Sequence, residues 1–225
     1  MSRRAMVFID GFNLYHSLDN VSSYKKYKWL NLWSLSEKLL FPGEMLVSVF
    51  YFTAYTDWNP DRKQRHQEYV AINEHFGCST VLGNFQKKTR YSAVPCGKPC
   101  QPSNSPSTHV KCCRKPFETH EEKKTDVNIA VHIIKNCVQG KCDAVYLLSG
   151  DNDLVPGLET AKELCPQIRF RVLLPINARA KTLMSVCKAN GFKYVRIKEQ
   201  HLMASQFPDP LVVGGKTYTK PKHWV

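Results

Sequence analysis

The sequence predicts an α/β fold in three layers, with a mainly parallel central sheet between two layers of helices. Short apolar runs at residues 5–9, 46–53, 144–148 and 169–174 have the composition of strands that are buried on both faces. Segments with helical spacing lie between these runs. Such alternation indicates parallel strands, because each parallel connection needs a crossover. The 225 residues fit one large domain, or one domain with an insertion.

Residues that favour turns and helix ends set the expected elements in the first half of the chain. Asp10-Gly11 ends the first strand, and a helix or turn begins at Phe12. Pro42-Gly43 ends one helix, whereas Asn59-Pro60 opens a charged helix that Gly77 closes. The further elements expected are a helix over residues 30–40, a strand over 46–53, a helix over 59–75, and a strand near a sheet edge over 79–82, with 85–88 as its continuation.

The second half of the chain continues the alternation. Apolar residues repeat at helical spacing within residues 121–134, and a buried strand follows at 144–148. Pro156 stands where a first helical turn tolerates proline, so Asp153 can cap a helix that runs to about residue 164. The remaining elements expected are a strand over 169–174, a helix over 178–189, a strand over 193–197, one or two helical turns over 199–205, and an extended tail over 207–225.

Residues 89–120 break the pattern and form a Cys-rich and Pro-rich insertion. Cys96 and Cys100 have the spacing of a zinc half-site, and Cys112-Cys113 would supply the second half, with His109 or His120 as substitute ligands. Adjacent cysteines rarely bind one ion together without backbone adjustment. A structural zinc knuckle and a plain basic loop therefore both stay open for this insertion.

Charge and cysteine content limit the partners and the compartment. The formal net charge of +13 favours a polyanionic partner, nucleic acid first, although a solvated basic surface without a partner would also give it. The chain begins without a signal peptide, and no apolar run approaches the roughly 20 residues that cross a bilayer. A cytoplasmic, reducing location is expected, with the nine cysteines free or metal-bound.

Acidic residues recur where strands end. Asp10 follows the first strand, and Asp151 and Asp153 follow residues 144–148 and Ser149-Gly150. Each aspartate alone would be an ordinary helix cap, but two like charges so close need a cation or hydrogen-bond donors. Carboxyl ends of parallel strands share one edge, so these acids and Asp126, near a helix start, can converge. Such a set predicts a site for Mg²⁺ or Mn²⁺.

Three motifs in this order resemble those of the NYN domain in its LabA/DUF88 branch, within the PIN-like nuclease superfamily. They are Phe8-Ile-Asp-Gly-Phe-Asn-Leu-Tyr15, Lys124-Thr-Asp-Val-Asn-Ile-Ala130 and Leu148-Ser-Gly-Asp-Asn-Asp-Leu-Val-Pro156. The resemblance covers roughly residues 5–197. It implies a PIN-like, Rossmannoid domain over residues 1–206, interrupted by the insertion at 89–120 and followed by the tail at 207–225.

The resemblance also implies a site. Asp10, Asp126, Asp151 and Asp153 match the acidic metal-site positions, and Asn13 and Ser149 match polar positions beside them. Many relatives carry a further aspartate where this chain has His132, which is expected to pack in the core or behind the ligands. The basic residues expected to hold the RNA backbone are Lys87, Lys88, Arg90, Lys123, Lys124, Arg179 and Lys181.

The leading hypothesis is therefore an Mg²⁺-dependent or Mn²⁺-dependent endoribonuclease. The alternative is a catalytically weak or inactive RNA-binding regulatory protein with the same fold. A phosphatase with an aspartyl nucleophile ranks last, because Gly11-Phe12 follows Asp10 where that class needs a second aspartate two residues on. Neither Gly-x-Gly-x-x-Gly nor a P-loop is present. A homodimer would lengthen the short RNA footprint of one basic domain and is kept as an open expectation.

Overall fold

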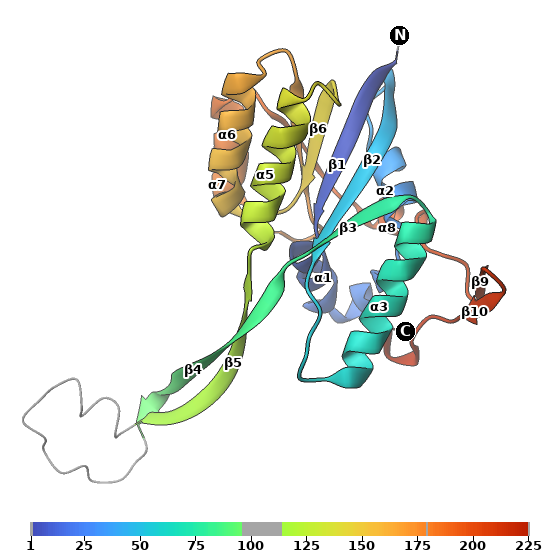
Figure 1. Cartoon of the computed structure of the whole chain (residues 1–225), viewed down its shortest axis with the longest axis vertical. Coiled ribbons are helices and arrows are strands. Elements are labelled where there is room, and N and C mark those ends of the chain that lie inside the picture. Colours follow the sequence, from blue (N-terminus) through green and yellow to red (C-terminus); the bar gives the residue numbers. More distant parts are fainter. Residues whose placement is uncertain (1, 96–113, 179, 225) are drawn as a thin grey trace, which may run out of the picture.

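Six parallel strands form the central sheet of the protein, in the order β3-β2-β1-β6-β7-β8. The structure is a computed structural model, and it describes residues 2–95, 114–178 and 180–224 (Figure 1). The predicted parallel sheet is confirmed. Its strands are β1 (Arg3–Asp10), β2 (Glu44–Thr53), β3 (Cys78–Leu82), β6 (Ala144–Leu148), β7 (Arg169–Leu174) and β8 (Lys193–Arg196).

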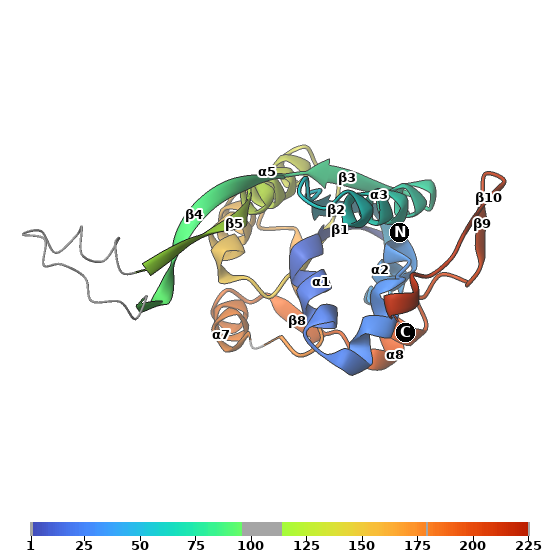
Figure 2. The ribbon, with the colours of Figure 1, turned by 90° about the horizontal axis from the view of Figure 1, so that it is seen from below.

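Helices cover both faces of the sheet and complete the three predicted layers (Figures 1 and 2). One face carries α1 (Gly11–Asp19), the 3-10 helix η1 (Ser22–Lys28), α2 (Leu32–Lys38), α3 (Pro60–His75) and α8 (Glu199–Met203). The other face carries α5 (Thr125–Val138), α6 (Val155–Leu164) and α7 (Lys181–Ala189). In the described parts of the chain, no helix has both the length and the apolar character needed to cross a membrane.

Strand β1 lies at the centre of the sheet and serves both hydrophobic cores. Val7 and Ile9 point into one core and Phe8 into the other, and all three are fully buried. An apolar run without alternation is what a strand covered on both faces requires. From β1 the chain moves to β2 and β3 on one side, and it later returns to β6, β7 and β8 on the other. The boundary between β1 and β6 is therefore the topological switch point, where open α/β sheets form a ligand crevice.

A long antiparallel ribbon projects from the sheet (Figure 1). It consists of β4 (Asn84–Pro95) and β5 (Arg114–Lys123). The ends of the predicted irregular insertion are thus strands, and the helix expected from residue 121 begins at Thr125 instead. Backbone hydrogen bonds between β4 and β5 form these strands, although their polar sequence shows no alternation of apolar and polar residues. The proposed zinc ligands Cys96, Cys100, Cys112 and Cys113, with His109, lie outside the described residues.

The last part of the chain folds against the domain, so the prediction of an extended tail over residues 207–225 is wrong. Strands β9 (Leu211–Val213) and β10 (Lys216–Tyr218) form a hairpin, and the 3-10 helix η3 (Lys222–Trp224) follows. Phe207 and Leu211 are buried in the core, and Trp224 lies against Trp29 and Tyr69. These few anchors stand among glycines and prolines, where local sequence does not reveal their contacts.

The close approach of α6 to α5 predicts the effect of one substitution, Gly157→Ala. A Cβ atom at position 157 would lie 2.7 Å from the Ala130 Cβ atom. Helix propensity alone would favour alanine by about 1 kcal/mol, but overpacking a close contact costs about 1–3 kcal/mol. We expect urea unfolding to show a net loss of stability. The double variant Gly157→Ala with Ala130→Gly should recover part of that loss. A single variant as stable as the wild type would contradict the packing argument.

Candidate active site

Asp10, the last residue of β1, is a buried carboxylate that two segments hold in place. Its Oδ1 atom accepts a hydrogen bond from the Asn13 backbone N–H at 2.9 Å and so caps α1. Its Oδ2 atom accepts one from the Ser149 hydroxyl at 2.8 Å. Burial raises the pKa of Asp10 to about 6, and nearby Asp126 and Asp151 act in the same direction, whereas the two hydrogen bonds oppose the shift.

Gly11 allows the helix to start directly after this carboxylate. A Cβ atom at position 11 would lie 2.6 Å from the Phe52 carbonyl oxygen and 2.6 Å from the Tyr51 ring. No other residue fits that space without displacing β2. Because glycine has no Cβ atom, α1 can begin directly against the sheet, and Asn13 comes to lie beside Asp10.

The loop after β6 is tied to the start of α1. The Asn13 side-chain oxygen accepts a hydrogen bond from the Gly150 N–H at 2.9 Å, and the Ser149 hydroxyl accepts one from the Asp151 N–H at 3.1 Å. Asp151 in turn caps the 3-10 helix η2 (Asn152–Leu154), accepting from the Asp153 N–H at 2.9 Å. The expectation that Asp153 caps α6 is therefore wrong. A 3-10 turn precedes α6 and moves the cap two residues back.

Asp126 reaches the same place from the first turn of α5. Lys124, just before this helix, has a φ angle of 78°, in the left-handed region that costs a non-glycine residue about 1–3 kcal/mol. This turn connects β5 to α5. Burial, followed by the charges of Asp151 and Asp153, raises the pKa of the Asp126 carboxyl group. The strained turn thus holds Asp126 close to the acids of the β6 loop.

Glu122 is an acidic residue of this site that the sequence did not reveal. It lies near the end of β5, and its Oε1 atom is buried without a hydrogen-bond partner. Burial raises its pKa to about 8, with the charges of Asp10 and Asp126 adding to the shift. Gly83 lets the chain pass close to the start of α5, since a Cβ atom there would lie 2.6 Å from the Thr125 hydroxyl oxygen and 2.9 Å from the Lys123 carbonyl oxygen.

The two neighbouring glutamates of β5 face opposite ways, as strand geometry requires. Glu121 forms ion pairs with Lys88, Arg90 and Lys123 on the ribbon, which lower its pKa to about 2. Glu122 faces the carboxylates instead. The sequence signal was the pair Glu121-Glu122 before Asp126. When this pair is assigned to a helix, the strand alternation that points the two side chains in opposite directions is missed.

A cleft of about 860 Å³ at the carboxyl edge of the sheet collects most of these groups. Asp10, Asp126 and Asp151 line it, as the sequence predicts, together with Asn13 and the additional Glu122. Asp153 is exposed and is not part of this lining, although its charge acts on Asp126.

The predicted substrate-binding residues have different surroundings. Ser149 is completely buried, so it positions Asp10 and does not face a substrate. Lys123 pairs with Glu121, and Lys124 and Lys181 are exposed. Arg179 lies outside the described residues.

His132 is half-buried and does not line the cleft. Its ring meets Phe50 and Phe52 edge-on, with ring centroids 5.6 and 5.4 Å apart. The histidine thus contacts aromatic side chains, and its role as a packing residue stays a prediction.

The residues of the cleft suit a hard divalent cation. Their ligand atoms are carboxylate and amide oxygens, and Mg²⁺ prefers such oxygens. Burial, and to a smaller extent mutual repulsion, raises the pKa values of Asp10, Glu122 and Asp126. A cation would offset both effects and would give Glu122 Oε1 a partner. In the described part of the chain, no three Asp, Glu, His or Cys side chains lie close enough together to hold a metal ion by themselves. Mg²⁺ commonly binds one or two carboxylates directly and keeps several waters, so it needs few ligands from the protein.

The fold and this acidic edge define a class of protein. Residues 4–194 match the family model of the NYN domain, and the chain belongs to the NYN domain family. That family has a PIN-like fold and its members are generally nucleases. The more specific assignment to the LabA/DUF88 branch stays a prediction.

Two known proteins are similar over most of the chain. One, from Pseudomonas putida, is named 6-hydroxy-3-succinoylpyridine 3-monooxygenase and is 23% identical over 98% of this chain and 75% of its own length. The other is a crystal structure of a protein of unknown function from Vibrio parahaemolyticus, with a TM-score of 0.52 and 15% identity over 92% of this chain and 97% of that one. The second likeness supports the fold alone.

The crowded carboxylates predict how stability depends on pH in metal-free protein. Asp10 and Glu122 hold protons more tightly in the folded state than in the unfolded chain. The free energy of unfolding that they contribute is therefore fully present at low pH, and it is lost as the pH rises through about 6 and about 8. We expect the Tm of metal-free protein to be lower at about pH 8 than at about pH 5, and Mn²⁺ to raise it again at the higher pH.

Glu122→Gln should flatten this pH dependence, because the glutamine does not ionise. Glu118→Gln is the matched control, since Glu118 lies exposed on the same strand and pairs with Lys87 at the surface. Thermal unfolding curves of the three proteins across this pH range provide the measurement. Parallel pH profiles of the wild type and Glu122→Gln would show that Glu122 is not a crowded acid.

Proposed function

We propose that this protein is an Mg²⁺-dependent or Mn²⁺-dependent endoribonuclease that hydrolyses RNA phosphodiester bonds in the acidic cleft. The observation that carries the proposal is the gathering of Asp10, Glu122, Asp126 and Asp151 in one cleft at the sheet's switch point. Membership of the NYN family supports a nucleic acid substrate. The net charge of +13 supports the same class of partner.

Each acidic residue of the cleft receives a role in this proposal. Asp10, Asp126 and Asp151 hold the cation directly or through water, and Asp153 adds negative charge nearby. When bound, the cation supplies Lewis-acid stabilisation of the negative charge on the phosphate oxygens. Glu122 has a buried carboxylate oxygen without a hydrogen-bond partner. We assign it to receive the proton of the attacking water once a bound cation has lowered its raised pKa.

Asn13 and Ser149 support the acids in different ways. The Asn13 side-chain oxygen accepts a hydrogen bond from the Gly150 N–H and so holds the loop after β6. The side-chain N–H groups of Asn13 are then left to donate to a phosphate. Ser149 keeps the Asp10 carboxylate oriented from behind. The removal of Ser149 would therefore change the position of Asp10 and not a contact with RNA.

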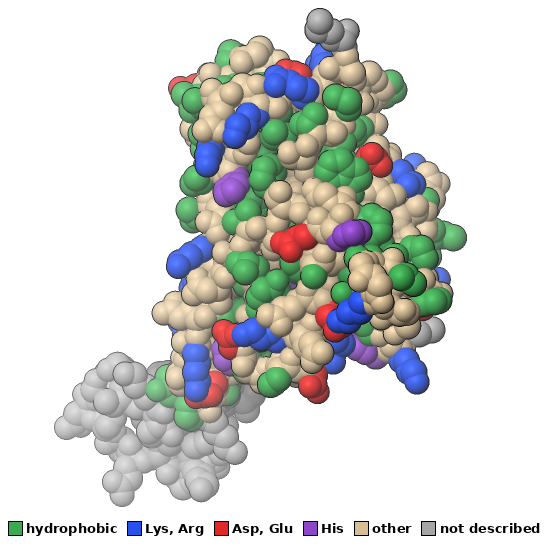
Figure 3. Space-filling model, turned by 45° about the vertical axis from the view of Figure 1, so that its right-hand side comes forward, with side chains coloured by type: hydrophobic (Ala, Val, Ile, Leu, Met, Phe, Trp, Pro, Cys, Tyr) green, Lys and Arg blue, Asp and Glu red, His purple; other side chains and the backbone are tan. Residues whose placement is uncertain are grey.

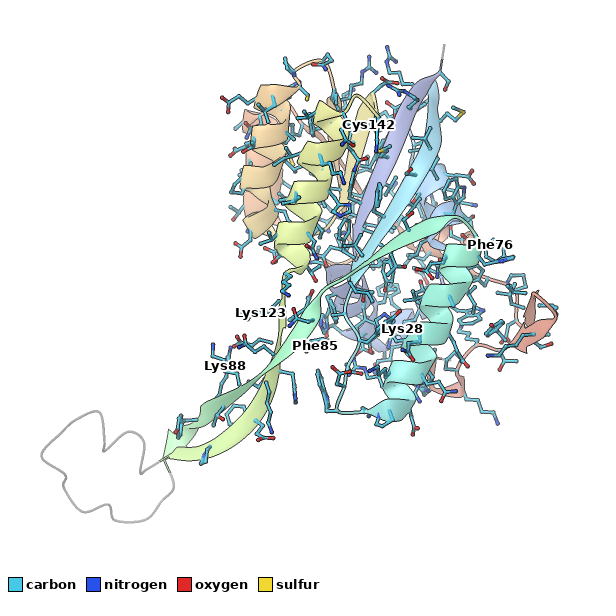
Figure 4. The ribbon with its side chains drawn as sticks, viewed as in Figure 1. Lys28, Phe76, Phe85, Lys88, Lys123 and Cys142 are labelled. Carbon is cyan, nitrogen blue, oxygen red and sulfur yellow. The ribbon has the colours of Figure 1, made fainter. Side chains whose placement is uncertain are left out.

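A row of aromatic rings leads from the cleft onto the ribbon and suits single-stranded RNA. Phe12 lines the cleft and meets Phe85 of β4 edge-on at 5.4 Å. Trp58 meets Phe85 at 4.9 Å and stacks on His120 of β5 at 3.6 Å. Figure 4 shows Phe85 where the ribbon joins the domain, with Lys88 farther out. Trp58 is 44% exposed, so its ring is accessible for base stacking.

The basic residues are distributed over the surface. Figure 3 shows Lys and Arg side chains spread over one face, with acidic side chains between them. On the ribbon, Lys87 pairs with Glu118, and Glu121 holds three other cations. Such exposed pairs are weak, and phosphates compete for them. We therefore expect RNA binding that is distributed over many contacts and sensitive to salt.

Cleavage of a labelled mixed-sequence RNA with Mn²⁺, Mg²⁺ or EDTA tests the proposal. Asp10→Asn and Asp151→Asn should lower the cleavage rate by about a hundredfold or more, because stabilisation by a bound cation is worth several kcal/mol. Asp143→Asn is the matched control, since Asp143 pairs with Arg4 just before β6, at the opposite edge of the sheet. Cleavage that persists in both cleft variants would point to a contaminant. RNA binding without any cleavage would favour the regulatory RNA-binding protein.

The exposed Trp58 predicts a separate effect on substrate binding. Trp58→Ala should raise KM for single-stranded RNA about tenfold and leave kcat nearly unchanged, because stacking on one base contributes about 1–3 kcal/mol. Phe76→Ala serves as a control, since Phe76 is an exposed aromatic residue that packs on Phe207, away from the cleft. An unchanged KM in the Trp58 variant would remove the aromatic row from the RNA path.

The relative from Pseudomonas putida supplies a second candidate function, oxidation of an aromatic ring. At 23% identity, this similarity is weaker support than the match to the family model. The two functions differ in a simple measurement. Oxygen uptake with 6-hydroxy-3-succinoylpyridine and an added reductant, in the absence of RNA cleavage, would favour the monooxygenase.

A further inference from the structure

A second pocket lies beside the acidic cleft and shares Phe12 with it. It measures about 290 Å³, close to the roughly 300 Å³ at which ligand sites begin. Its walls come from α1, η1, the end of β2, α3 and the C-terminal residues around Trp224. The pocket therefore depends on the C-terminal segment that folds back over this face.

The interior of the pocket is apolar and aromatic. Tyr51 and Tyr69 are buried there with Leu30, and Tyr15 and Trp224 are partly buried at the boundary. Flat rings on several sides suit a planar ligand, because aromatic groups stack or meet edge-on at low cost. This interior alone would accept any small aromatic group.

The charged groups of the pocket are cationic. Lys28, Arg62 and Arg65 line it, and no Asp or Glu does so among the described residues. The Lys28 side chain is only 5% exposed, pairs with Asp19 and lies 4.7 Å from the centre of the Tyr15 ring. The adjoining cleft carries four carboxylates. The two cavities thus have opposite charge and share one aromatic wall.

Neutral hydrogen-bonding groups complete the pocket. The Thr56 hydroxyl is buried and has no hydrogen-bond partner. The His66 Nε2 atom lies 3.2 Å from the Thr53 hydroxyl, and burial lowers the pKa of His66 to about 4, so the ring is neutral near pH 7. A buried hydroxyl without a partner is unfavourable unless a ligand supplies one. Neutral donors and acceptors of this kind suit the edge of a nucleobase.

We propose that this pocket binds one nucleotide of the substrate RNA, next to the phosphate that lies in the acidic cleft. The base occupies the aromatic interior near Thr56, and its phosphate lies against Lys28, Arg62 and Arg65. This inference rests on the proposed function for the source of the nucleotide. A simple anion would leave the aromatic interior unused, and an uncharged aromatic ligand would leave Arg62 and Arg65 without an anionic partner. A nucleotide satisfies both.

Direct binding of the four nucleoside 5′-monophosphates tests the pocket by isothermal titration calorimetry. The full-length protein is used, with inorganic phosphate and nicotinate as comparison probes. Arg62→Gln with Arg65→Gln should weaken nucleotide binding about tenfold or more, because the variant lacks the two guanidinium groups that would donate to the phosphate. Thr56→Val should weaken it less and leave Tm unchanged or raised, since it removes a hydroxyl without a partner. Lys63→Gln is the matched control on α3, because Lys63 pairs with Asp57 outside the pocket.

Three results would overturn the proposal. They are no saturable nucleotide binding, binding that the arginine and threonine variants leave unchanged, and phosphate or nicotinate binding as tightly as any nucleotide. Asp151→Asn should still bind the nucleotide, which separates the pocket from catalysis. Nucleotide binding without RNA cleavage by the wild type would support the pocket and contradict the nuclease. Cleavage with intact KM in the double arginine variant would contradict the pocket and support the nuclease.

Discussion

The buried Asp10 carboxylate is the interaction on which the arrangement of the site depends. It joins the end of β1, the start of α1 and the loop after β6 through its bonds to Asn13 and Ser149. The loop after β6 is distant in sequence from the junction of β1 and α1 but lies beside it at the switch point. Without the Ser149 hydroxyl and the Asn13 N–H, a carboxylate that is only 4% exposed would be costly to bury. The same bonds therefore fix both the fold and the acidic edge.

The crowded acids of the cleft lower the stability of the folded protein. Asp10, Glu122 and Asp126 all have raised pKa values, which means that their charged forms are disfavoured in the folded protein. The left-handed turn at Lys124 adds backbone strain at the same place. Strain and like charges gathered at one edge are typical of functional sites, where surrounding structure compensates for them. Here the two cores on either face of the sheet provide that compensation.

The molecule combines opposite charges over a short distance. An acidic cleft and a cationic aromatic pocket meet at Phe12, on a chain whose net charge is +13. RNA alternates phosphates with flat bases, so it can use carboxylates through a cation and can use cations and rings directly. Trp58 extends the same pattern through Phe85 of the ribbon, which meets Phe12. This combination supports the proposal of a polymeric substrate over a single small anion.

The sequence by itself determined the sheet, most helix limits and the positions of Asp10, Asp126 and Asp151, because apolar runs and turn residues act locally and parallel strands end at one edge. It also indicated that His132 contacts other side chains and is not a ligand. Only the tertiary structure decided the ribbon, the placement of the C-terminal hairpin, the cap at Asp151 and the position of Glu122. The Asp151 cap follows from a local 3-10 turn, whereas the others depend on contacts between segments far apart in the chain. The two-residue alternation that turns Glu122 inward exists only once β5 pairs with β4, and no local pattern encodes that pairing.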